Sequence, residues 1–258
     1  MTSRRVTTIA AVWTIVLSAS IGHAQDVVDG FAARAFVGAN GLRMPYRIFV
    51  PDDEHRRRPL PVIVYLHGSG GIGTDNLRQI SGGNTNGTHV WATPQAQKGH
   101  PAFVVAPQLP AGNRWDAPDT DGIAPYAGVL IELLDTLSRE FAIDRDRVYL
   151  TGQSLGGYGT WDLVTKRPEV FAAAVPLCGG GTVSRAAAAR RVAIWAFHGA
   201  KDPLVPVAGS RDMVAALHAA KGTVKYTEYA ETGHDVWTVA YVERDLPGWL
   251  FEQKRRLR

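Results

Sequence analysis

A serine lies between two glycines at a point where a strand pattern gives way to a helical pattern, and few folds accommodate this arrangement. Residues 152–156 read Gly-Gln-Ser-Leu-Gly; they follow the apolar run 148–150 and precede a helical segment that ends before Pro168. A G-x-S-x-G motif in this setting is typical of a sharp turn that exposes the serine at the end of a sheet. The glycines are needed because other backbone segments approach closely there. The motif predicts that Ser154 is a nucleophile, rather than an incidental serine in a glycine-rich turn.

Short apolar runs that we expect to be strands recur along most of the chain. They are 31–37, 42–50, 62–66, 103–106, 148–150, 172–177, 193–197 and 224–229. The first two flank Asn40 and Gly41, a pair that favours a hairpin and therefore an antiparallel edge. Most of the others lack polar alternation, as expected of strands buried on both faces of a parallel sheet.

Helical patterns lie between several of these runs. An apolar stripe extends from Leu130 to Phe141, and a second begins at Met213 and ends near Gly222, which is suited to a helix C-cap. Alternating strands and helices predict one α/β domain over residues 25–258, a mostly parallel sheet with helices on both faces and no large lid domain. The stretch 69–100, rich in Gly, Asn and Thr, is expected to be a long irregular loop at the active site.

The first residues predict export. Arg4 and Arg5 precede an apolar run, 6–21, and small residues at positions 22 and 24 suit signal-peptidase cleavage after Ala24. A membrane anchor is the alternative, but the run is short and contains several Thr and Ser residues. We therefore expect a periplasmic or extracellular protein with no stable membrane anchor. Basic clusters at 56–58 and 254–256 have no interleaved aromatic residues, so nucleic acid is not an expected partner.

A serine nucleophile needs a base, and in folds with this turn the base follows an acid in the chain. Three histidines lie downstream of Ser154: His198, His218 and His234. His218 falls in a helical pattern and His198 directly ends a strand, which favours surface and structural roles. His234 lies in the loop after the final strand. The order of the chain therefore predicts His234 as the base.

Three carboxylates could orient that histidine. Asp202 follows the strand 193–197 at its carboxyl end, the edge where catalytic groups collect in open α/β sheets. Asp235 adjoins His234, and neighbouring side chains do not easily make the required contact. Glu231 is a second rival. We predict Asp202 as the acid of a triad with Ser154 and His234.

The oxyanion of a tetrahedral intermediate needs backbone N–H donors. One is expected from Leu155, and the other from Ser69 in the glycine-rich stretch 67–71, with Gly70 as an alternative. Residues 68–73 also match G-x-G-x-x-G, but the polar segment 74–88 does not predict the helix that a dinucleotide site requires.

Three residues are candidates for the substrate pocket: Trp115, Gln153 and Trp237. Core packing is the alternative for each tryptophan. The single cysteine, Cys178, excludes an internal disulfide and a cysteine-based zinc site, and its apolar surroundings favour a buried, inert thiol. We expect no metal and no organic cofactor.

The chain resembles bacterial phospholipase/carboxylesterase-type α/β hydrolases, a group often labelled predicted peptidases. Polyhydroxybutyrate-depolymerase-like esterases and dienelactone hydrolases are similar relatives. The matching stretches are 66–68, 74–76, 152–157, 196–202 and 233–235. The resemblance implies the α/β-hydrolase fold, with Ser154, Asp202 and His234 at the triad positions. Residues 70–73, Gly-Gly-Ile-Gly, depart from the Glu-Arg pair that many relatives carry there.

These observations predict a serine-dependent carboxylic-ester hydrolase that works through an acyl-enzyme on short-chain acyl, aryl or polymeric esters. A serine peptidase of prolyl-oligopeptidase type, with the same triad, is one alternative. A non-catalytic binding protein on a hydrolase scaffold is the other, although such proteins normally lose a triad member. The natural substrate and the oligomeric state stay open at this point.

Overall fold

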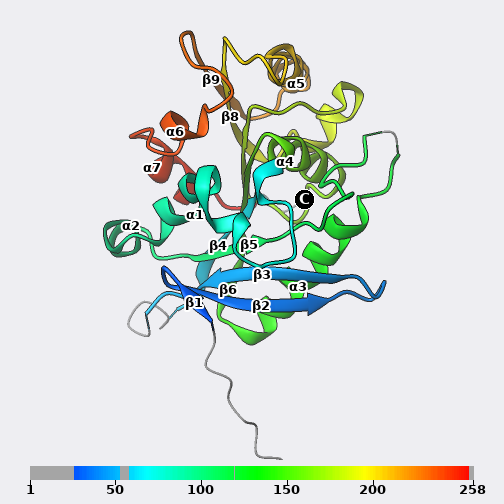
Figure 1. Ribbon diagram of the computed structural model, residues 1–258. Coiled ribbons are helices and arrows are strands. Elements are labelled where there is room, and N and C mark those ends of the chain that lie inside the picture. The colour runs from blue at the N-terminus through cyan, green and yellow to red at the C-terminus, as the bar shows by residue number, and fades with distance from the viewer. Residues whose placement is uncertain (1–25, 53–57, 119, 256–258) are drawn as a thin grey trace, which may run out of the picture.

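The chain folds around one large sheet. The computed structural model describes residues 26–52, 58–118 and 120–255. The predicted signal peptide, 1–24, lies outside the described residues, as do parts of both basic clusters. Within the described residues, nine strands form one sheet in the order β1-β2-β3-β5-β4-β6-β7-β8-β9 (Figure 1). Among the helices of this described part, none has the length and apolar character needed to cross a membrane.

The sheet is mostly parallel. Strands β5, β4, β6, β7, β8 and β9 run parallel to one another, while β1, β2 and β3 form an antiparallel edge beside β5. The strands are β1 (Val27–Val28), β2 (Phe31–Val37), β3 (Arg43–Phe49), β4 (Leu60–Leu66), β5 (Phe103–Pro107), β6 (Ile143–Gln153), β7 (Ala173–Leu177), β8 (Ala193–Gly199) and β9 (Val224–Tyr229).

Helices cover both faces of the sheet, as predicted. The α-helices are α1 (Thr85–Ala92), α2 (Pro94–Gly99), α3 (Pro125–Glu140), α4 (Leu155–Lys166), α5 (Ala208–Ala219), α6 (Trp237–Ala240) and α7 (Leu246–Phe251). Apolar side chains of α3, α4 and α5 pack into one buried cluster, and those of α1, α6 and α7 into a second. The side chains of strand β4 contribute alternately to the two clusters, since Val64 belongs to the first cluster and Tyr65 to the second. This alternation follows from the two-residue period of a strand.

The hairpin prediction is confirmed and one strand is longer than predicted. Strands β2 and β3 pair in antiparallel register around Gly41, whose φ of +79° suits a residue without a side chain. Strand β6 begins at Ile143, five residues before the predicted run. Its first half is polar because Asp144 and Arg147 form an ion pair on a half-buried surface, so apolar periodicity could not predict it.

The prediction of a long irregular loop over 69–100 is wrong. This stretch contains three 3₁₀ helices, η2 (Ser69–Gly71), η3 (Arg78–Ile80) and η4 (Gly82–Asn84), followed by α1 and α2. Helix α1 lies close to strand β4 at Gly87, where a Cβ atom would stand 2.0 Å from the Tyr65 ring. The glycine that lowers the helix propensity of the segment is therefore required by packing.

Candidate active site

Ser154 occupies a tight turn between β6 and α4. Its backbone has φ 55° and ψ −116°, a conformation that costs a non-glycine residue about 1–3 kcal/mol. A Cβ atom at Gly156 would stand 1.9 Å from the Leu66 carbonyl oxygen, and one at Gly152 would stand 2.5 Å from the Gly156 oxygen. Both glycines of the motif are therefore required for the backbone to pass. The turn exposes the serine at the carboxyl end of the central strand.

Two further loops meet at the same edge of the sheet. Strand β8 leads to Asp202, and strand β9 leads to His234. The loops touch at Gly199, where a Cβ atom would stand 2.2 Å from the Gly233 oxygen. The Lys201 N–H also donates to the Thr232 carbonyl at 3.0 Å. This close approach brings the acid loop and the histidine loop together.

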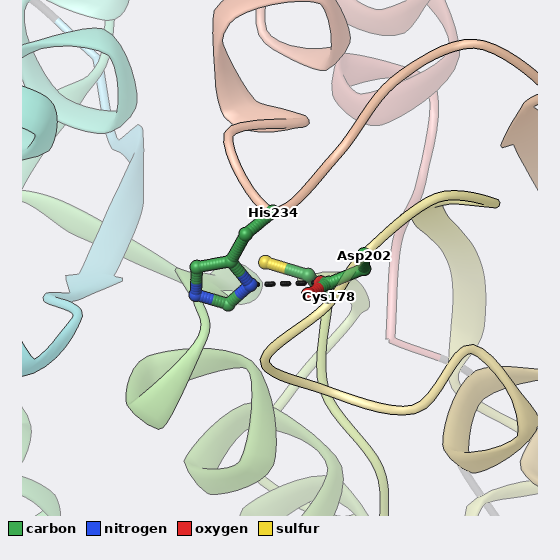
Figure 2. Close-up of side chains that lie close together, drawn as sticks. All are labelled: Cys178, Asp202 and His234. Carbon is green, nitrogen blue, oxygen red and sulfur yellow. Dashed lines mark hydrogen bonds and ion pairs between the residues drawn. The ribbon is translucent and has the colours of Figure 1, made fainter.

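The three predicted side chains form one hydrogen-bonded chain. Ser154 Oγ lies 2.9 Å from His234 Nε2. His234 Nδ1 lies 2.7 Å from Asp202 Oδ2, the contact that Figure 2 marks with a dashed line. With the proton of the neutral imidazole on Nδ1, that nitrogen donates to the carboxylate, and Nε2 is free to accept the serine proton. The arrangement can therefore activate a hydroxyl nucleophile.

The turn after β8 holds Asp202 as a carboxylate. Its side chain is fully buried, and Oδ1 accepts the backbone N–H groups of Leu204 at 2.8 Å and Val205 at 2.9 Å. Burial by itself would raise the pKa of Asp202. The N–H groups of Val205 and Leu204 and the imidazole of His234 outweigh burial, so the pKa of Asp202 is lowered from its ordinary value.

The rival residues lie elsewhere. Glu231 is 82% exposed and pairs with Lys201 on the surface. His218 is exposed on α5. His198 is buried behind the acid, where Nδ1 contacts Ser210 Oγ at 2.8 Å and Nε2 lies 3.1 Å from the Val205 carbonyl. Its Nε2 is also 3.3 Å from Asp202 Oδ2, so a second, buried imidazole contacts the same carboxylate. Sequence reasoning gave His198 only a general structural role.

The predicted oxyanion donors border the nucleophile. Leu155 begins α4, so its N–H is among the first of a helix, which have no partner within the helix. Ser69 and Gly70 line the same cavity as Ser154. Asn84 Oδ1 fixes this loop by accepting the Gly68 N–H at 3.1 Å and the Tyr65 hydroxyl at 2.9 Å. Sequence reasoning missed Asn84, because nothing in the pattern of 69–100 distinguishes it from its polar neighbours.

His67 supports the oxyanion loop as a neutral imidazole. Its Nδ1–H donates to the Gly68 carbonyl at 2.6 Å, and its Nε2 accepts the Leu109 N–H at 2.9 Å. Protonation would remove the acceptor for Leu109. Burial lowers the pKa of His67 from 6.5 to about 4, against a smaller opposite effect of the Gly68 carbonyl.

The stability of the folded chain should consequently fall in mild acid, because His67 binds a proton more readily in the unfolded chain. The unfolded chain binds a proton at this residue below about pH 6.5, and the folded chain does so only below about 4. The free energy of unfolding should fall by about 3 kcal/mol across this window. Urea titrations at several pH values check this by comparing the native chain with His67→Asn, which cannot titrate, and with His218→Asn as a surface control. A parallel pH dependence in the native chain and His67→Asn would contradict the expectation.

A cavity of about 340 Å³ opens over the serine. It is lined by Gly68, Ser69, Gly70, Arg78, Ser81, Gly82, Gly83, Asn84, Gln153, Ser154, Leu204, His234 and Trp237. Two predicted pocket residues, Gln153 and Trp237, are in this set. Gln153 Nε2 donates to the Gly83 carbonyl at 3.1 Å, and the Trp237 ring packs edge-on against the His234 imidazole. The segment 69–100 supplies the wall that faces these residues.

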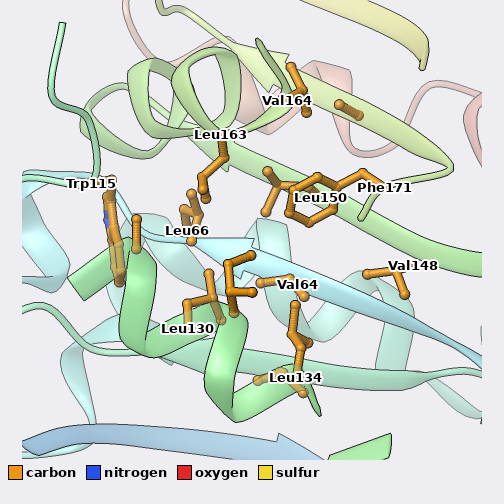
Figure 3. Packing of buried hydrophobic residues seen from close by; sticks show 14 of the residues in the cluster. Val64, Leu66, Trp115, Leu130, Leu134, Val148, Leu150, Leu163, Val164 and Phe171 are labelled. Carbon is orange, nitrogen blue, oxygen red and sulfur yellow. The ribbon is translucent and has the colours of Figure 1, made fainter. Parts of the chain in front are cut away.

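Trp115 does not line this cavity, so the sequence expectation for it is corrected. Its side chain is fully buried and belongs to the same apolar cluster as Leu66 and Leu130 (Figure 3). The indole N–H donates to the His67 carbonyl at 3.2 Å, and a Cβ atom at Gly159 would stand 2.2 Å from the Trp115 Cβ. The large apolar ring is needed to fill the space under the oxyanion loop and leaves no face for a substrate.

Cys178 lies behind the acid and the histidine, as Figure 2 shows. It is buried, as predicted, and burial raises the pKa of its thiol far above the ordinary value. Potential metal-ligand atoms of Cys178, Asp202 and His234 lie within 4.8 Å of one another. A neutral thiol is a poor metal ligand, and His234 Nδ1 is already bonded to the carboxylate. The donor set therefore fits a proton relay better than a metal site.

The geometry agrees with solved structures. The chain superposes on the crystal structure of a thermostable esterase with a TM-score of 0.83 and 40% sequence identity, over 88% of this chain and 64% of that chain. The chain has the α/β-hydrolase fold. The model of the prolyl oligopeptidase family matches residues 130–185, which include Ser154. The fold prediction from sequence is thereby confirmed.

Curated relatives are named as esterases and depolymerases. Poly(3-hydroxyalkanoate) depolymerase C of Paucimonas lemoignei is 31% identical over 127 residues, 46% of this chain and 28% of that protein. A probable feruloyl esterase C of Aspergillus niger is 24% identical over 180 residues, 68% of this chain and 62% of that protein. The chain thus spans less than two thirds of the length of these relatives. The similarity agrees with the esterase resemblance inferred from the motifs.

Proposed function

We propose that this α/β hydrolase is a serine-dependent carboxylic-ester hydrolase. The observation that carries the proposal is the continuous hydrogen-bonded chain from Ser154 Oγ through His234 to the buried Asp202 carboxylate, at the floor of an open cavity. Esterase relatives support the same activity. A triad of this kind can hydrolyse an ester with its own side chains and the backbone N–H groups beside them.

The proposed reaction runs through an acyl-enzyme. Ser154 Oγ attacks the ester carbonyl while His234 Nε2 takes the hydroxyl proton. Backbone N–H groups of Leu155 and Ser69 bind the oxyanion of the tetrahedral intermediate. His234 then returns the proton to the departing alcohol as the acyl–oxygen bond of the ester breaks. Water, deprotonated by the same imidazole, then attacks the acyl-enzyme, and the imidazolium returns the proton to Ser154 Oγ as the bond from the acyl group to that oxygen breaks and the acid leaves.

The proposed substrates are short-chain acyl, aryl or polymeric esters. A cavity near 340 Å³ is at the small end for ligand sites. Each methylene contributes about 0.8 kcal/mol only when it is buried, so a tail that leaves the cavity gains nothing.

A graded series of p-nitrophenyl esters tests both the activity and the size of the site. The value of kcat/KM should be highest for acetyl to butyryl esters and should decline beyond about six to eight carbons. Each ester is used below its micelle threshold. A steady rise to dodecanoyl esters would instead mean a deep acyl tunnel, and absence of turnover on the whole series would refute the proposed activity.

Amide hydrolysis is the second candidate function, because the family model that matches residues 130–185 is that of prolyl oligopeptidases. The same triad can cleave either bond. Matched ester and anilide substrates with one acyl group separate the two, and we expect the ester to be preferred.

We also propose that the protein is exported to the periplasm or the extracellular space. The proposal rests on the charged, apolar and small-residue pattern of residues 1–24, which lie outside the described residues. The N-terminal residue of the exported protein should be Gln25, which Edman sequencing checks.

A further inference from the structure

The charge of the active-site cavity is distinctive. Among its described lining residues, Arg78 is the only permanently charged side chain, and none of them is Asp or Glu. Glycines border the space beside it, since a Cβ atom at Gly70 or Gly82 would meet no atom within 4 Å. The cavity therefore combines one cation with open room and no competing anion on its walls.

The backbone of Arg78 is fixed relative to the nucleophile. Asn84 Nδ2 donates to the Arg78 carbonyl at 3.0 Å, and Asn84 Oδ1 accepts the N–H of Gly68 in the oxyanion loop at 3.1 Å. Asp75 Oδ1 accepts the Arg78 N–H at 3.0 Å. A single asparagine thus ties η3, which carries the arginine, to the loop that faces Ser154.

Asp75 forms an ion pair with the side chain of Arg78. Asp75 Oδ2 lies 3.1 Å from Arg78 Nε, while Oδ1 is used by the N–H groups of Leu77 and Arg78 and by Gln108 Nε2. Burial would raise the pKa of Asp75, but these donors outweigh it and lower the pKa. The aspartate is therefore a lasting counter-ion for Nε.

The outer end of Arg78 remains available. Neither Nη atom of Arg78 donates a hydrogen bond to a described residue, and the side chain is 64% exposed. The two Nη groups of a guanidinium form a rigid fork that matches the two oxygens of a carboxylate. A side chain that is paired with Asp75 at Nε, and whose Nη atoms make no hydrogen bond to the described residues, presents this fork to the cavity that contains the nucleophile.

We propose that Arg78 binds a carboxylate carried by the substrate, so that the preferred esters are anionic ones, formed from hydroxy acids or dicarboxylic acids. This inference rests on the proposed esterase function and names its substrate class. The free carboxylate would lie away from the scissile ester, on either its acyl or its alcohol side. Arg78 acts here in substrate selection and takes no part in the proton transfers.

Two matched substrate pairs test the inference. Mono-p-nitrophenyl adipate is compared with p-nitrophenyl hexanoate for a carboxylate on the acyl side, and 4-acetoxybenzoate with 4-acetoxybenzamide for one on the alcohol side. The measured quantity is the ratio of kcat/KM for the charged ester to that for its neutral partner. In Arg78→Gln this ratio should fall about tenfold or more on at least one pair, as expected when a charged hydrogen bond is lost.

Two variants sharpen the result. Arg78→Lys should recover only part of the ratio, because an ammonium keeps the charge without the fork. Arg139→Gln, on the exposed surface of α3, is the matched control and should leave the ratio at the native value. Added salt should lower the native ratio, since the Arg78 side chain is exposed. An unchanged ratio in Arg78→Gln on both pairs would overturn the inference.

A binding measurement separates this inference from the proposed activity. Calorimetry compares Ser154→Ala with the double variant Ser154→Ala/Arg78→Gln for binding of mono-p-nitrophenyl adipate and of 4-acetoxybenzoate, with no turnover needed. The Kd of at least one of these ligands should be about tenfold weaker in the double variant. Equal Kd values for both ligands would refute the carboxylate site even if neutral esters are hydrolysed. If the native chain hydrolyses no ester, the esterase proposal fails, and the Kd comparison still decides the role of Arg78.

Discussion

The Ser154→Ala variant is expected to lose on the order of 10⁴-fold or more in kcat while remaining folded. The hydroxyl is the only group at the turn that can form the acyl-enzyme, and it accounts for one partly buried hydrogen bond, to His234 at 2.9 Å. Residual hydrolysis would come from binding and from the oxyanion donors alone. The stability of the variant should change little, because alanine leaves the surrounding packing and the backbone of the turn in place.

Two measurements check this expectation. Steady-state kinetics on p-nitrophenyl butyrate give kcat, and a fluorophosphonate probe reports the activated serine by covalent labelling. Ser138→Ala is a matched control, because its hydroxyl donates to the Leu134 carbonyl within α3, away from the active-site edge. Labelling should be lost in Ser154→Ala and kept in the control. A probe that still labels Ser154→Ala would move the nucleophile to another residue.

The parts of the fold that the sequence predicted are those where local pattern and tertiary packing require the same residues. The apolar run 62–66 is buried on both faces of the sheet, so each of its positions has to be apolar. The glycines beside Ser154 are required by contacts of 1.9 to 2.5 Å that any side chain would make. Such steric requirements leave a clear mark on a single sequence.

Other features depend on contacts between distant segments and could not be predicted. Helix α1 contains Gly87, which opposes helix formation locally but is required beside Tyr65. At the end of α5 the left-handed residue is Lys221, with φ 56°, and the predicted cap Gly222 follows it and donates to the Leu217 carbonyl at 2.8 Å. The glycine therefore indicated where the helix ends, but not which residue adopts the positive φ.

The candidate site divides in the same way. Ser154 and His234 follow from motif and chain order, and the place of Asp202 at the carboxyl end of a strand favoured it over Glu231 and Asp235. Trp115 was predicted to line the pocket and instead packs in the core, because the sequence does not show which of these places a tryptophan occupies. The sequence does not distinguish Arg78 and Asn84 from the polar residues around them. Both line the cavity, and Asn84 also accepts the Gly68 N–H, and neither relation is visible in the local pattern.

The Asp202→Asn variant provides the sharpest test of the acid. The backbone N–H groups of Leu204 and Val205 both donate to Oδ1, so they select the orientation in which the asparagine oxygen replaces Oδ1. The asparagine NH₂ then faces His234 Nδ1, which has to accept a hydrogen bond instead of donating one. The imidazole proton consequently moves to Nε2, which faces Ser154 Oγ and can no longer take its proton.

The predicted loss in kcat/KM for Asp202→Asn is roughly 10⁴-fold on p-nitrophenyl butyrate, with geometry and packing nearly unchanged. Glu231→Gln and Asp235→Asn are the matched controls, since each removes a carboxylate near the same histidine loop. Glu231 pairs with Lys201 at the surface, so its loss should have little effect on turnover. A mild effect at Asp202 together with a severe one at Glu231 or Asp235 would assign the acid to the other residue. Because the buried Asp202 is the carboxylate in contact with Nδ1, we expect the large loss at Asp202 alone.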